Sequence, residues 1–107
     1  MELTTIGQVI ATRRIRSEGA NGTNYLVKIG LPQQFPDSTD YYCPVQVISE
    51  PDNQGEVLYS AGIDSVQALQ LGMKLAGGIL FRLNQNCGGK LRWEGDENGD
   101  LGLPVPD

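Results

Sequence analysis

The sequence contains no histidine and only two cysteines, Cys43 and Cys87. The absence of histidine excludes histidine-dependent serine and cysteine nucleophiles and histidine pH switches. Two cysteines cannot supply a four-cysteine zinc site or a disulfide framework. We therefore expect no catalytic residues, no metal site and no cofactor, and we interpret the chain as a non-enzymatic protein.

Long hydrophobic runs are also absent. Every apolar stretch is far shorter than the ~20 residues that cross a bilayer. Residues 1–12 do not have the basic region and apolar run of a signal peptide. The expectation from these two absences is a cytoplasmic protein with no membrane contact.

Basic residues are missing from two parts of the chain. Residues 33–62 and residues 93–107 each carry five acidic residues and no basic one, and the net charge is -5. Nucleic-acid binding needs a basic surface, so this distribution argues against it. Acidic blocks of this kind suit a protein partner with a basic surface.

The length and the apolar patterning predict one folded domain over residues 1–107, with 39% hydrophobic residues. Apolar alternation or β-branched enrichment predicts strands, and Pro44 inside the third indicates an edge position or a bulge. The predicted strands cover residues 6–15, 25–31, 41–48, 56–61 and a short fifth segment, 90–94.

A change of period after residue 62 predicts a helix. Asp64 is a good N-cap, and Gln67 stands where a side chain can return a hydrogen bond to the cap. Apolar residues at three- and four-residue spacing continue as far as Leu83, and the helical region ends at 87–89. The fold class predicted from this order is α+β: an antiparallel sheet of four to five strands with one long helix packed on one face.

Two features of these elements need a structural explanation. Gly72, Gly77 and Gly78 each lower helix propensity, which predicts a close approach to a strand or a second chain. Arg13 falls on an otherwise apolar strand face, and Asp64 is a candidate acidic partner for it. A deep pocket lined by Arg13 and Asp64 would favour a small-molecule-binding domain.

Three short segments carry a family resemblance: Thr12-Arg13-Arg14-Ile15, the helix opening Asp64-Ser65-Val66-Gln67-Ala68-Leu69, and Leu101-Gly102-Leu103-Pro104. They resemble a family of small bacterial proteins of unknown function. The resemblance implies a small α+β domain over most of the chain. It implies no activity and transfers no catalytic residues.

The function predicted from these observations is an immunity-type inhibitor that covers a bacterial toxin by protein–protein contact. Acidic residues would meet the basic partner, and aromatic residues would anchor the contact. The candidate partner-binding residues are Asp37, Asp40, Tyr41, Tyr42, Glu50, Asp52, Trp93, Asp96, Glu97 and Asp100. The alternatives are a self-associating structural or regulatory module, such as a homodimer, and a small-molecule-binding domain.

Overall fold

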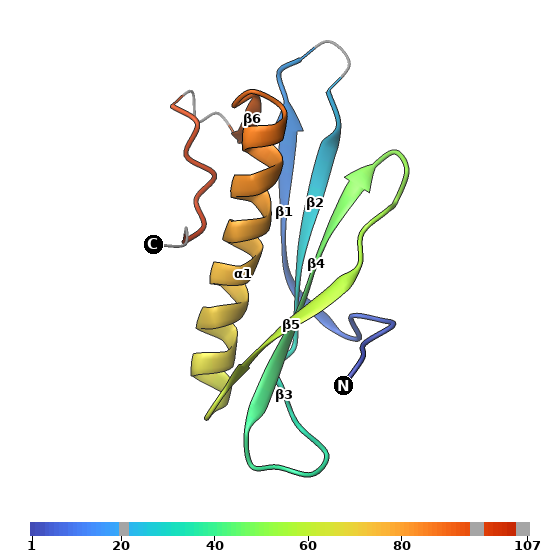
Figure 1. The fold of residues 1–107 in the computed structure, drawn as a ribbon, viewed down its shortest axis with the longest axis vertical. Coiled ribbons are helices and arrows are strands. Elements are labelled where there is room, and N and C mark those ends of the chain that lie inside the picture. The colour runs from blue at the N-terminus through green and yellow to red at the C-terminus, as the bar shows by residue number, and fades with distance from the viewer. Residues whose placement is uncertain (20–21, 95–97, 105–107) are drawn as a thin grey trace.

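A computed structural model describes residues 1–19, 22–94 and 98–104 of the chain. Its described residues form six strands and one helix (Figure 1). In chain order these are β1 (Val9–Ser17), β2 (Asn24–Gly30), β3 (Gln33–Gln34), β4 (Tyr41–Glu50), β5 (Val57–Gly62), α1 (Ser65–Asn86) and β6 (Leu91–Trp93).

All strand pairs are antiparallel, and the sheet runs in the order β5-β4-β2-β1-β6. The strand β3 pairs with the first residues of β4, beyond the end of β2. The α+β prediction, a sheet with one helix on one face, is confirmed. The additional strand is β3, a two-residue pairing between the predicted strands 25–31 and 41–48.

Pro44 does not lie on an edge strand, because β4 has β2 on one side and β5 on the other. The pairing between β2 and β4 stops at Ile29 opposite Val45, and β3 pairing begins at Gln33 opposite Tyr42. Pro44 therefore occupies a gap in the ladder, where its missing N–H leaves no hydrogen bond unmade.

The core lies between α1 and one face of the sheet. The helix packs mainly over β4 and β5 (Figure 1). Alternation along each strand sends apolar side chains to this face, and small helix residues allow close packing. The buried core residues are Ile15, Val27, Ile29, Cys43, Val45, Val47, Ala68, Ala76, Leu80 and Leu91.

The start of α1 has the predicted cap. The carboxylate of Asp64 accepts a hydrogen bond from Gln67 N at 2.7 Å. The Gln67 side chain accepts one from Ile63 N at 2.8 Å, one residue before the cap rather than at the cap itself. These two bonds satisfy one backbone N–H of the first turn and one of the residue that precedes the cap.

Two of the helix glycines lie at close approaches. A Cβ at Gly72 would meet Cys43 Sγ on β4 at 2.7 Å, so the absence of a side chain at Gly72 lets α1 approach β4 closely. A Cβ at Gly77 would collide with the carbonyl oxygen of Pro104. The close partner of Gly77 is therefore the C-terminal part of the same chain, which runs back along α1 (Figure 1).

Candidate binding surfaces

Residues 98–104, here called the C-terminal strap, are held by a half-buried arginine. Arg13 Nη1 donates a hydrogen bond to Leu101 O at 3.1 Å, and its guanidinium lies 3.9 Å from the centre of the Trp93 ring. Gly102 adopts φ +74° against both side chains. The predicted pair of Arg13 with Asp64 is not formed: Arg13 meets the strap and Trp93, while Asp64 caps the helix. The pair on which the small-molecule alternative depended is therefore not present.

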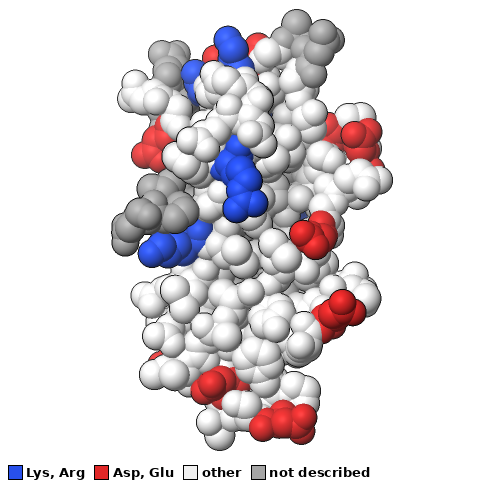
Figure 2. Space-filling view, in the orientation of Figure 1, with Lys and Arg blue, Asp and Glu red and all other residues white. Residues whose placement is uncertain are grey.

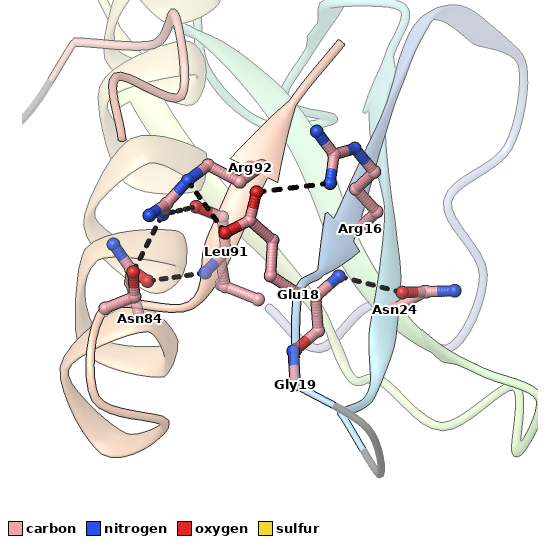
Figure 3. A network of polar contacts seen from close by, with 9 residues as sticks. Arg16, Glu18, Gly19, Asn24, Asn84, Leu91 and Arg92 are labelled. Atoms are coloured by element: carbon pink, nitrogen blue, oxygen red, sulfur yellow. Dashed lines mark hydrogen bonds and ion pairs between the residues drawn. The ribbon is translucent and has the colours of Figure 1, made fainter. Parts of the chain in front are cut away.

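A network of polar contacts joins the ends of β1 and α1 to β6 (Figure 3). Glu18 pairs with Arg16 at 3.5 Å and with Arg92 at 3.6 Å. Asn84, near the end of α1, accepts a hydrogen bond from Leu91 N at 3.0 Å. Together these contacts tie α1, β1 and β6, so two of the arginines in this region serve the fold.

An open concavity of about 690 Å³ lies on the sheet beside this network. The exposed Arg14 forms an ion pair with Glu50 at 3.2 Å. The concavity is lined by both basic and acidic side chains: Thr12, Arg13, Arg14, Ile15, Arg16, Asn24, Glu50, Trp93 and Glu94. Arg14 and Arg16 are paired with Glu50 and Glu18, and Arg13 is engaged by Leu101 O and Trp93, so the three arginines of this concavity already have partners within the fold.

The predicted acidic residues do not form one surface. Asp37 and Asp40 lie in the loop before β4, whereas Glu50 and Asp52 lie at the far end of that strand. A ten-residue strand separates these pairs by roughly 30 Å. Asp96 and Glu97 fall outside the described residues.

The aromatic candidates divide in a similar way. Tyr41 packs against the core on the helix side, while Tyr42 lies on the opposite face of the sheet. There Tyr42 packs against Phe35 at 5.1 Å and against Tyr59 at 5.9 Å, measured between ring centres. Neither Phe35 nor Tyr59 was among the predicted site residues, because two separate pairings bring their rings to Tyr42. The pairing of β3 with β4 places Phe35, and the pairing of β4 with β5 places Tyr59.

Two further candidates have contacts within the fold. Trp93 lies beneath Arg13 and Gly102. The carboxylate of Asp100 accepts a hydrogen bond from Gly102 N at 2.8 Å, which shapes the strap. The structure therefore brings together Asp37, Asp40 and Tyr42, with Phe35 and Tyr59 added. We call these five residues the acidic aromatic end.

The acidic aromatic end has an ordered loop and unpaired charge. Phe35 N donates to Asp40 O at 3.0 Å, and Asp40 N donates to Ser38 Oγ at 3.0 Å. Asp37 and Asp40 are exposed, and neither forms an ion pair with any described residue. Figure 2 shows the wider pattern, with basic side chains in the upper part of the face, and acidic ones along the right margin, at the lower end and at the upper left.

The two thiols differ in environment. Cys43 is fully buried, and burial raises the pKa of its thiol to about 11. Its Sγ donates to Gly30 O at 3.6 Å. Cys87 is exposed at the end of α1. A buried thiol that is neutral at pH 7 is a packing group rather than a nucleophile.

Residues 1–19, 22–94 and 98–104 contain no group of three or more cysteine or acidic side chains placed to hold a metal ion. Within the same ranges, α1 is not apolar enough over its length to cross a membrane.

The fold and its surfaces define a small two-layer α+β domain with charged and aromatic surface clusters. Residues 11–105 match the family described as a domain of unknown function, DUF6968, and the chain belongs to that family. Comparison with curated proteins and with solved structures gave no match.

Proposed function

We propose that this protein is a non-enzymatic inhibitor of the immunity type, which binds a basic surface of a toxin or similar protein through the acidic aromatic end. The observation that carries the proposal is the position of two exposed carboxylates, Asp37 and Asp40, in the loop that supplies Phe35 to a packed aromatic cluster. Neither carboxylate forms an ion pair with a described residue.

The chemistry of this surface suits a protein partner. Aromatic side chains that are already packed lose little conformational freedom on binding, and they are common energetic anchors in interfaces. Phe35, Tyr42 and Tyr59 hold one another with ring-centre distances of 5.1 to 5.9 Å. The hydrogen bonds within the loop reduce the ordering cost of binding.

The charge pattern selects the class of partner. Unpaired carboxylates steer a basic surface toward the loop and repel an acidic one, and the effect weakens as salt is added. The other acidic end of β4 is less suited to this task, because Arg14 already pairs with Glu50.

Capture of the partner by matched charge variants tests the proposal. The tagged protein, the double variant Asp37→Asn/Asp40→Asn and the control Asp52→Asn/Glu56→Gln are each used to capture proteins from lysate of the source organism. Both double variants remove two exposed charges, but only the first changes the acidic aromatic end.

The expected result is one stoichiometric partner with a basic surface, bound equally by the unchanged protein and the control. Loss of two charge contacts should lower the affinity of the loop variant by about tenfold or more at low salt. Equal capture by the loop variant, or binding insensitive to salt, would refute the proposed interface. If the partner is a toxin, inhibition of its activity should follow the same order.

A further inference from the structure

The outer side of β5 is an open edge of the sheet. Ser49 N donates to Gln54 O at 2.9 Å, so the backbone groups of Ser49 point toward the β5 side of β4. Backbone direction alternates along a strand, so Cys43 and Val45 point the same way. Their register partners Ser60 and Leu58 must point back toward β4.

The remaining residues of β5 therefore point outward. The N–H and C=O groups of Val57, Tyr59 and Ala61 face away from β4, and no described residue forms a ladder with them. Three residues at alternate positions thus present a row of unused backbone donors and acceptors.

This edge lacks the features that usually prevent strand pairing. Natural proteins protect open edges with charged side chains, proline or bulges. The whole of β5, Val57–Gly62, contains no charged residue and no proline, and its register with β4 is unbroken. By contrast, the part of β1 beyond its pairing with β6 carries Arg13 and Arg14.

Space and apolar surface adjoin the edge. A concavity of about 700 Å³ is lined by Val57, Leu58 and Tyr59 of β5, by N-terminal residues, and by Leu75 of α1. Leu71 lies one helical turn before Leu75, on the same side of α1, and is 39% exposed. Figure 2 shows few charged atoms in the lower half of the face that α1 occupies.

We propose that β5 pairs with β5 of a second copy of this chain, antiparallel about a two-fold axis at Tyr59. Val57 of each copy then faces Ala61 of the other, and Tyr59 faces Tyr59. Every outward backbone group gains a partner, for a total of about six hydrogen bonds. Because α1 packs over β4 and β5, the two helices lie side by side on one face with Leu71 and Leu75 between them.

The edge of β5 suits a second copy because its three outward residues, Val57, Tyr59 and Ala61, are spaced evenly about Tyr59 and are therefore self-complementary. The chain carries a net charge of -5, so two copies can pair only where their acidic residues do not face one another. In the proposed register, Glu56 faces Gly62 and Asp64 faces Gln54, so no acidic residue faces another. A charged partner strand would find no opposite charge along β5 itself.

The mass in solution, measured by sedimentation equilibrium from low to high micromolar concentration, tests the pairing. We expect a reversible dimer of the 11.6 kDa chain. Ala61→Lys should raise its dissociation constant by about tenfold or more, because pairing would place a charged side chain opposite the apolar Val57 of the other copy. Ala61→Pro removes only an outward N–H and should have a similar effect without unfolding the monomer.

Gln85→Lys adds the same charge on an exposed part of α1 and should leave the dimer intact. The register is tested in Val57→Cys/Ala61→Cys/Cys87→Ser, where the two new thiols are roughly 13 Å apart within one chain but adjacent across the axis. Mild oxidation should give a covalent dimer. A monomer throughout the concentration range would overturn the inference, as would a dimer that both Ala61 variants leave unchanged.

Discussion

The two edges of the sheet are built in opposite ways. At the β1 edge, β6 and the C-terminal strap meet Arg13, Trp93 and the ion pairs of Glu18. At the β5 edge, six uncharged residues end the sheet with no described strand beyond them. Charge and the strap stabilise the first edge, whereas the second retains unused backbone groups. The comparison indicates that stability is concentrated at one edge and the capacity for association at the other.

The largest effect should come from breaking the closed edge at Gly102. Gly102→Ala forces a side chain into φ +74° and places its Cβ 2.6 Å from Trp93 Cζ3. Backbone strain and overpacking together should lower the free energy of unfolding by about 2–4 kcal/mol. Urea denaturation measures the change.

Gly88→Ala is the matched control for this variant. Gly88 has φ +75° but a Cβ there meets nothing within 4 Å, so only the backbone strain remains. Its cost should be about 1–2 kcal/mol. Equal losses in the two variants would show that the strap does not pack against Arg13 and Trp93 as described.

A second, smaller effect distinguishes two neighbouring arginines of β1. Arg13→Ala removes the contact with Trp93 and the hydrogen bond to Leu101 O, and should cost about 1–3 kcal/mol. Arg14→Ala removes an ion pair whose arginine is 76% exposed, and should cost less than about 1 kcal/mol. Thermal or urea unfolding of both variants checks the order, which a larger loss for Arg14 would contradict.

Cys43 of β4 is buried in the core next to Gly72 of α1. Burial raises the pKa of this thiol from 9.0 to about 11, so folding favours its neutral form. The stabilisation is complete below pH 9 and is lost as the pH rises toward 11. We expect the melting temperature to fall over this range, and to fall less steeply in Cys43→Ala.

Thiol labelling at pH 8 gives a simpler test of the same burial. A thiol reagent should modify the exposed Cys87 rapidly and Cys43 only after unfolding. Rapid modification of both thiols in the native protein would mean that the open edge exposes the core behind it.

The elements of the fold could largely be predicted from the sequence because their signals are local. Alternation in β2 and the cap formed by Asp64 and Gln67 each depend on residues within a few positions of one another. The short β3 was missed because two residues carry no periodic pattern.

The surfaces could be predicted only in part, since they depend on distant residues. Arg13 and Leu101 are 88 positions apart, and no spacing rule indicated their contact. The acidic residues form blocks in the sequence, but in the structure β4 separates Asp37 and Asp40 at one end from Glu50 and Asp52 at the other. The aromatic cluster required the register that places Tyr59 opposite Pro44, beside Tyr42.

Amide hydrogen exchange at low and high protein concentration tests the contrast between the two edges most directly. The account predicts that the outward amides of Tyr59 and Ala61 exchange rapidly in dilute solution and become protected in the dimer. The amide of the buried Ile15 should stay protected at both concentrations. Unchanged exchange at Tyr59 and Ala61, or new protection that appears at Thr12 and Arg14 instead, would contradict the account.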